Sequence, residues 1–187
     1  MANPDKPNGF RPVGTLSGGP VTMANIRFVG VADGEDIFLG DMVNLESGLA
    51  DPMATNDAAI LGAVVGIGKY DELTGSVAAL ADVANLNNRF YDDSASTHTD
   101  YYVAVALATD CVYEVQSNAD LDSVVGDPLD LVDGVGNSTT GRSIQEVGAN
   151  TNSDFVVVAI PDYPDNDSTL TNTRYHVRVT RAEQALG

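Results

Sequence analysis

Apolar residues recur along this chain in short runs, many with a period of two, which predicts β-strands rather than helices. In residues 101–108, Tyr101, Val103, Val105 and Leu107 fall on one face, and alanines fill most of the other. Residues 111–116 and 175–180 alternate in the same way, and the continuous runs 60–68 and 155–160 are typical of buried strands. Residues 21–31 and 37–45 complete the expected strands. The pattern therefore predicts a β-rich body.

Turn-forming residues separate these runs. The chain holds 21 Asp but only 6 Glu, and Asp favours turns and caps whereas Glu favours helix interiors. Residues 76–86 fit either a helix or a strand, residues 121–126 fit a short helical turn, and residues 134–141 are expected to form a loop. The predicted fold class is all-β with one or two short helices, arranged as a small β-barrel or a sandwich.

The first twenty residues have a different pattern, with four prolines, four glycines and few side chains that could build a core. Proline fixes φ and removes a backbone donor, so this segment is expected to be extended. No apolar run follows Lys6, which argues against a secretory signal. We therefore divide the chain into an extended N-terminal arm, residues 1–20, and a β-rich body, residues 21–187. The arm is interpreted as a tether that binds another molecule.

The net charge of −18 narrows the range of partners. Residues 1–28 and 174–187 each carry +2, which leaves −22 on residues 29–173. A field of this sign repels nucleic acid, so no nucleic-acid partner is expected. No apolar run is long enough to span a bilayer, so no membrane partner is expected either. Two interpretations of the acidic residues remain open. They form an ordinary solvated surface, or the acidic body faces water while the basic ends of the chain bind a partner.

Catalytic motifs are weak. The segment 62–70 lacks the first glycine of a phosphate-binding loop, because position 63 is Ala63, and Tyr70 follows Lys69 where a hydroxyl residue is needed. Neither His98 nor His176 lies in a recognisable triad motif. The lone Cys111 lies in an alternating apolar run and is interpreted as a small buried side chain. We therefore expect no enzyme activity, no catalytic residues, no cofactor and no metal.

Two acidic groups are candidates for incidental calcium binding, because calcium takes six to eight oxygen ligands. They are Asp162, Asp165, Asn166 and Asp167, and then Asp127, Asp130 and Asp133. Neither follows the EF-hand pattern, and both also suit ordinary turns.

Several phrases of the sequence resemble a known family when they are taken in order. These are MANPDKPNGFRPVG, ILGAVVGIGKY, YYVAVALATDCVYEVQSNAD, GNSTTGRSIQEV and FVVVAIPDYPDND. They are similar to segments of the capsid decoration, or cement, proteins of tailed bacteriophages, which often begin with a short Asn/Pro/Lys arm ending in Gly-Phe-x-Pro. The resemblance implies a non-enzymatic virion protein, assembled in the host cytoplasm, that sits on the outer surface of the head as a trimer. Its partners would be the major capsid protein and further copies of itself.

Phe10 is then the natural apolar anchor of the arm, flanked by Lys6 and Arg11 for acidic groups of the partner. The candidate capsid-contact residues are Pro4, Lys6, Pro7, Phe10, Arg11, Pro12, Val13 and Leu16. The alternative function is a β-rich module of a phage tail or fibre that binds calcium or a glycan. The tether interpretation requires that the arm contact another molecule rather than thread through the interior of its own chain.

Overall fold

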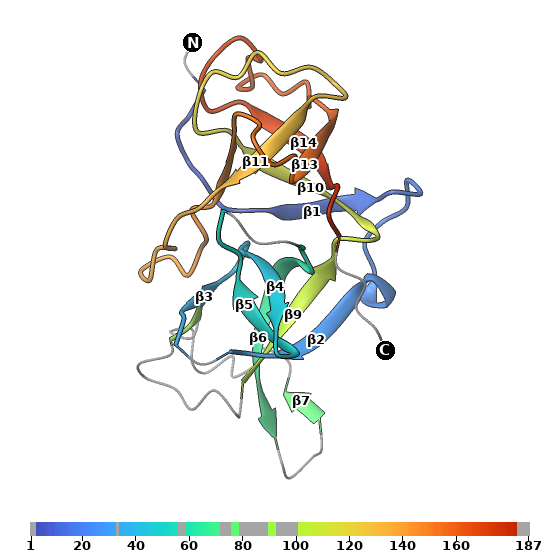
Figure 1. The fold of residues 1–187 in the computed structure, drawn as a ribbon, viewed down its shortest axis with the longest axis vertical. Coiled ribbons are helices and arrows are strands. Elements are labelled where there is room, and N and C mark those ends of the chain that lie inside the picture. Colours follow the sequence, from blue (N-terminus) through green and yellow to red (C-terminus); the bar gives the residue numbers. More distant parts are fainter. Residues whose placement is uncertain are drawn as a thin grey trace.

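The computed structural model describes residues 3–32, 34–55, 59–71, 76–78, 90–92 and 101–182. Within these residues the fold is all-β, as the apolar pattern predicts, and the sheets are antiparallel. The only helix in this part of the chain is one short 3-10 turn, η1 (Met23–Asn25). Figure 1 shows two lobes stacked along the long axis of the molecule.

The upper lobe in Figure 1 holds a six-stranded sheet in the order β1-β10-β14-β13-β11-β12. Its strands are β1 (Arg11–Thr15), β10 (Cys111–Gln116), β11 (Pro128–Val132), β12 (Glu146–Gly148), β13 (Phe155–Ala159) and β14 (Arg174–Val179). Strand β1 crosses the molecule at the junction between the lobes (Figure 1). It thus forms one edge of this sheet.

The lower lobe holds a second sheet in the order β2-β9-β6-β4-β5, with β7 paired to β6. Its strands are β2 (Ile26–Gly30), β4 (Met42–Glu46), β5 (Leu49–Pro52), β6 (Gly62–Asp71), β7 (Ser76–Ala78) and β9 (Tyr101–Leu107). A separate pair is formed by β3 (Ile37–Phe38) and β8 (Phe90–Tyr91). The tight turn 108–110 joins β9 to β10 and so connects the two sheets.

Each sheet bends so that two segments that are not neighbours in its strand order come together. In the upper lobe, Ser117 and Val147 form an isolated parallel bridge, and in the lower lobe Val31 and Ala50 do the same. Neither bridge extends into a ladder, so the described strands form no closed barrel and the arrangement is consistent with a sandwich. Of the two architectures left open by the sequence, the closed barrel is therefore not the one observed.

Two clusters of buried apolar side chains form the core of the described structure. One lies under the lower sheet and includes Val31, Leu61 and Val105. The other combines Tyr113 of the upper sheet with Met42 of the lower sheet, so it continues across the junction. Burying a large apolar side chain contributes roughly 1.5–3 kcal/mol. Packing across this junction therefore fixes the position of everything that lies between the lobes.

The alternating runs are confirmed as strands. In β14 the side chains of Tyr175, Val177 and Val179 are buried, whereas Arg178 points to solvent. The run 37–45 is split into β3 and β4 by a turn at Gly40, whose φ of +95° suits glycine. Cys111 is fully buried, as predicted.

Other predictions differ from the structure. Residues 121–126 form no helix, and β5, β8, β11 and β12 lie in segments with no predicted strand. These four strands are short, and β5 and β11 contain proline and aspartate, which usually mark turns. Part of the ambiguous run 76–86 and His98 lie outside the described residues.

The N-terminal arm is the main correction. Residues 11–15 are extended as predicted, but as β1 they pair with β10 of the same chain. The side chain of Phe10 is only 1% exposed, and its ring stacks on Phe155 with the ring centroids 4.8 Å apart. A coreless tether that is free of its own body is therefore wrong for residues 3–15. Proline keeps the segment extended, but the surface on which it lies belongs to this chain.

Candidate functional site

The leader, which we define as residues 3–15, crosses the lower lobe at a contact between two glycines. The amide of Phe10 donates a hydrogen bond to the carbonyl oxygen of Gly40 over 2.8 Å. A Cβ added to Gly9 would lie 2.4 Å from that same oxygen, and one added to Gly40 would lie 2.5 Å from the carbonyl oxygen of Asn8. Only residues without a side chain allow the backbones to approach this closely.

Hydrogen bonds fix the start of the leader to the upper lobe. The buried side chain of Asn3 donates to the carbonyl oxygens of Asp167 (2.8 Å) and Thr171 (3.0 Å). In return, the amide of Asp167 donates to Oδ1 of Asn3 over 2.8 Å. Further along, the amide of Lys6 donates to Oε1 of Gln116 over 3.1 Å. The leader is thus held at both of its ends and forms a rigid wall.

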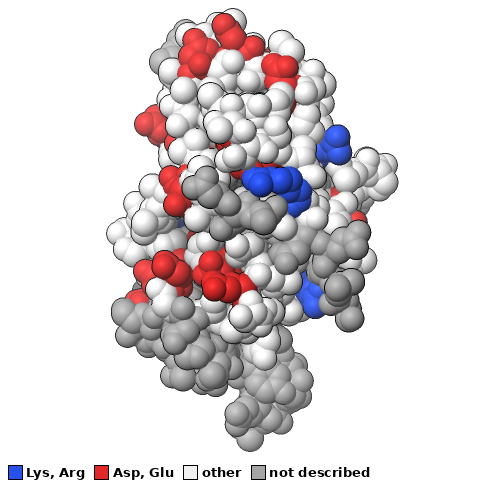
Figure 2. Space-filling view, in the orientation of Figure 1, with Lys and Arg blue, Asp and Glu red and all other residues white. Residues whose placement is uncertain are grey.

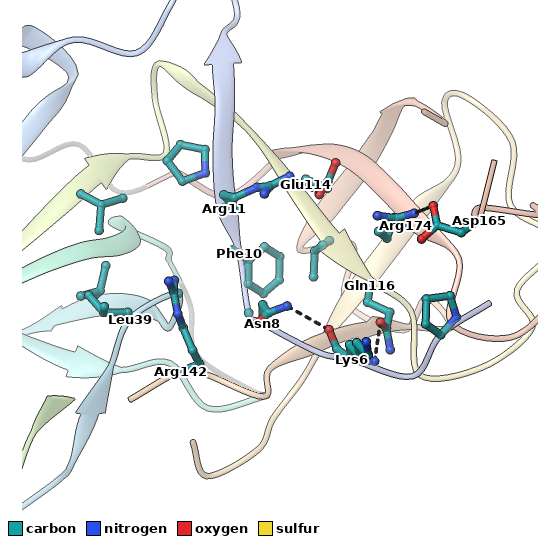
Figure 3. Close-up of a pocket in the computed structure, with 17 residues that line it drawn as sticks. Lys6, Asn8, Phe10, Arg11, Leu39, Glu114, Gln116, Arg142, Asp165 and Arg174 are labelled. Atoms are coloured by element: carbon teal, nitrogen blue, oxygen red, sulfur yellow. Dashed lines mark hydrogen bonds and ion pairs between the residues drawn. The ribbon is translucent and has the colours of Figure 1, made fainter. Parts of the chain in front are cut away.

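A groove of about 670 Å³ lies between this wall and the junction of the lobes. Strand β10 contributes Glu114 to Gln116, and β6 contributes Val64 and Val65. Figure 3 shows Arg142 and Leu39 at one end of the groove, Arg174 and Asp165 at the other, and Asn8 and Phe10 between them. We call this cavity the leader groove.

The predicted contact residues divide into three groups. Those that line the leader groove are Pro4, Lys6, Phe10, Arg11 and Pro12. Of these, Phe10 is packed inside its own chain and cannot anchor a partner in this conformation. The side chains of Val13 and Leu16 are 40% and 50% exposed and lie outside the groove, as does the half-buried Pro7.

Positive charge is concentrated around the leader groove. Four of the nine lysine and arginine residues of the chain line it: Lys6, Arg11, Arg142 and Arg174. Arg11 pairs with Glu114 over 2.6 Å, and Arg174 pairs with Asp165. Among the residues that the structure describes, neither Lys6 nor Arg142 has an ion pair. The groove therefore holds two uncompensated cations on a strongly acidic chain.

Glu114 organises the part of the groove near β10. One of its carboxylate oxygens accepts from Arg11, and the other accepts from the hydroxyl of Tyr163 over 2.9 Å. Nε2 of His176 lies 3.4 Å from that second oxygen. The hydrogen bond to Glu114 raises the pKa of Tyr163, and the guanidinium of Arg174 lies 4.7 Å from the centre of the Tyr163 ring. These contacts hold Arg11 and Arg174 in place from within the chain.

The visible surface has an uneven distribution of charge. On the face in Figure 2, carboxylates lie at the top, down the left side and over the left part of the lower lobe, whereas the few lysine and arginine side chains lie near mid-height and along the right side. The acid-rich middle of the sequence is therefore spread over both lobes.

A second groove, of about 610 Å³, lies on the other side of the turn 38–41. It is lined by the carboxylates Glu35, Asp36, Asp41, Glu46, Asp51 and Asp133. Asp41 is 2% exposed, and Oδ2 of Asp41 accepts a hydrogen bond from the amide of Phe38 over 2.7 Å. Burial nevertheless raises the pKa of Asp41 to about 6. We call this cavity the acidic groove.

The candidate calcium groups serve as acceptors in turns. Asp130 accepts hydrogen bonds from the amides of Asn152 and Ser153, and Asp127 accepts one from the amide of Val124. Asp167 accepts from both the amide and the hydroxyl of Thr169, and these bonds lower its pKa. Within the described ranges, no three His, Cys, Asp or Glu side chains are grouped so that they could hold a metal ion.

The structure also shows where the candidate catalytic residues lie. Residues 62–71 form strand β6 rather than the strand-to-helix turn of a phosphate-binding loop. Burial raises the pKa of the Cys111 thiol, which opposes formation of the reactive thiolate. In β14, Nε2 of His176 lies 3.4 Å from Oε2 of Glu114.

The sequence matches no protein-family model, no curated protein and no solved structure. In the described part of the chain, no helix is long and apolar enough to cross a membrane.

The sequence pointed to the leader residues and, through the basic stretch 174–187, to Arg174, but it did not point to Arg142. Arg142 follows the loop 134–141 and Arg174 opens β14, so neither is near the leader in sequence. Contact of these residues with a partner stays a prediction. Asn3 and Gly40 were missed because their roles depend on partners far along the chain. One sequence signal could have pointed to Arg142. Basic residues are scarce in this acidic chain, so each of them is a candidate for a specific role.

Proposed function

We propose that this chain is a capsid decoration protein of a tailed bacteriophage, which binds the outside of the assembled head and stabilises contacts between major capsid subunits. The observation that carries the proposal is the leader groove, where uncompensated cations gather on an acidic all-β body. The ordered similarity of its sequence phrases to that family points the same way. The function is adhesion, and the acidic outer surface keeps particles apart.

The leader contributes in a way that differs from a free tether. It is already fixed by Asn3, Phe10 and its pairing with β10, so little conformational entropy is lost when a partner binds. The exposed side chains of Val13, on the leader, and of Leu16, the residue that follows it, offer apolar contacts to a partner. A trimer would present three such surfaces together, and their weak individual contacts would add through high effective concentration.

The alternative, a calcium- or glycan-binding module of a tail or fibre, has less in its favour. The acidic side chains that the sequence suggested for calcium, such as Asp130 and Asp167, already accept hydrogen bonds from backbone amides of nearby loops.

Electron microscopy of phage particles from the lysate in which this chain is made tests the proposal. An antiserum against the purified protein should label the outer surface of full heads and leave tails unlabelled. Purified protein should also sediment with heads that lack it and raise the temperature at which they release DNA. Labelling confined to tails or fibres would overturn the proposal.

A further inference from the structure

We propose that the leader groove binds an extended, carboxylate-bearing segment of a partner polypeptide, with Lys6 and Arg142 as the pairing cations. This inference deepens the proposed function, since a capsid subunit would supply the segment. The chemistry of the occupant follows from the groove, from these two cations and from the apolar side chains that line the groove with them.

In the described parts of the chain, two of the four groove cations have no ion pair, whereas the other two have one. Arg11 and Arg174 already have carboxylate partners in Glu114 and Asp165. Lys6 and Arg142 have none within the described parts of the chain, and Figure 3 shows them on different sides of Asn8. A ligand that offers two separated carboxylates would complete the charge balance. Arginine also binds a carboxylate through two parallel hydrogen bonds.

The lining of the leader groove is not purely polar. Pro4, Pro12, Leu39 and Val65 line the groove and each keeps part of its surface accessible. The volume of about 670 Å³ is within the usual range for ligand sites. One wall is the extended backbone of the leader itself. This combination fits a peptide with acidic and apolar side chains better than it fits a small inorganic anion.

Two other anionic occupants are distinguished by their chemistry. A nucleic acid carries a dense negative charge and would be repelled by a body with a net charge of −18. A short acidic segment of a polypeptide carries fewer charges and is repelled less. A second copy of this chain is an outcome of the test below, because the proposed function already brings several copies together.

The test uses fluorescence anisotropy with the full-length protein. The probe is a labelled octapeptide of alternating glutamate and valine, and the comparison probes are a lysine–valine octapeptide and an eight-nucleotide single-stranded DNA. Binding of the glutamate probe should weaken when salt is raised from about 50 to about 300 mM, because the ion pairs are screened. The other two probes should bind at least tenfold more weakly.

Two double variants separate the groove from the overall charge. Lys6→Glu with Arg142→Glu should weaken binding of the glutamate probe at least tenfold. The matched control, Arg27→Glu with Arg178→Glu, makes the same change in net charge at residues that do not line the groove, and it should alter binding less than twofold. Circular dichroism and thermal melting establish that both variants are folded.

Several outcomes would overturn the inference. They are no binding of the glutamate probe, equal weakening by both double variants, tighter binding of the DNA, or self-association in sedimentation that disappears with Lys6→Glu and Arg142→Glu. Sedimentation with heads separates this inference from the proposed function. If the groove variant binds heads as well as the wild type does, only the inference fails. If the wild type binds the probe but not heads, only the proposed function fails.

Discussion

The two grooves on either side of the turn 38–41 have similar volumes and opposite chemistry. The leader groove, of about 670 Å³, is lined by four cations, and the acidic groove, of about 610 Å³, is lined by six carboxylates. Leu39 and Gly40 face the first, and Phe38 and Asp41 face the second. A single short turn thus separates two regions of opposite charge.

The two grooves also balance their charges differently. In the leader groove, Glu114 and Asp165 each hold an arginine, and the remaining cations are exposed and ready to pair. In the acidic groove, Asp41 is buried with only one of its oxygens hydrogen-bonded in the described structure. The unpaired cations of the leader groove are available to a ligand. The buried carboxylate of Asp41 in the acidic groove instead lowers the stability of the fold at neutral pH.

The largest expected effect comes from removing the anchor of the leader. Phe10→Ala deletes a fully buried ring that stacks on Phe155, and such changes typically cost about 3–5 kcal/mol of unfolding free energy. Urea denaturation measures the loss, and Val13→Ala is the exposed control, expected to cost about 0.5 kcal/mol or less. If Phe10→Ala leaves the unfolding free energy unchanged, Phe10 does not hold the leader on the body. The interpretation of the leader as a free tether would then stand, and the leader would not form a rigid wall of the groove.

Next in size is the effect of the buried carboxyl group in the acidic groove. A pKa of about 6 for Asp41, against 3.8 in an unfolded chain, means that the folded state binds a proton more tightly. Stability from this group is complete below about pH 4 and is lost as pH rises through 6, in total about 3 kcal/mol. Asp41→Asn should therefore stabilise the protein at pH 7.5 and have little effect at pH 4. Thermal melts of both proteins across this range check the sign, and destabilisation at pH 7.5 would contradict it.

A smaller effect is expected at the start of the leader. Asn3→Ala removes the side chain that bonds to Asp167 and Thr171, and it should cost about 1–2 kcal/mol. Asn8→Ala is the matched control, because within the described residues the exposed side chain of Asn8 makes only a local hydrogen bond, to the carbonyl oxygen of Lys6. Hydrogen exchange of the amides in residues 3–10 should increase for Asn3→Ala alone. Equal effects of the two variants would mean that Asn3 does not anchor the leader.

The smallest effect on stability is expected from the free cations of the leader groove. Lys6→Glu with Arg142→Glu should change the unfolding free energy by no more than about 0.5 kcal/mol, because both side chains are exposed and unpaired in the described structure. Urea denaturation at two salt concentrations provides the measurement. A loss of several kcal/mol would assign these residues to folding and remove the contrast between the grooves.

The sequence predicted the class of the fold better than it predicted the site. Period-two runs identified β9, β10 and β14, because strands with one face in the core leave that signal. The prolines correctly indicated an extended leader, but a single Phe10 cannot reveal whether its pocket belongs to this chain or to another. That pocket is formed by Phe155, and Arg142 and Arg174 reach the groove from distant segments. Which distant residues meet at the groove depends on the topology of the sheets, and a local sequence pattern does not reveal that topology.

The way the leader is fastened has a consequence for how the molecule is made. Three of its attachment points, Asp167, Thr171 and Phe155, lie far along the chain from the leader. A ribosome makes the chain from its N-terminus, so the leader emerges long before these residues can secure it. Until β13 and the loop that follows it have been synthesised, Phe10 stays accessible to proteases, and any product truncated before residue 155 carries that vulnerability permanently.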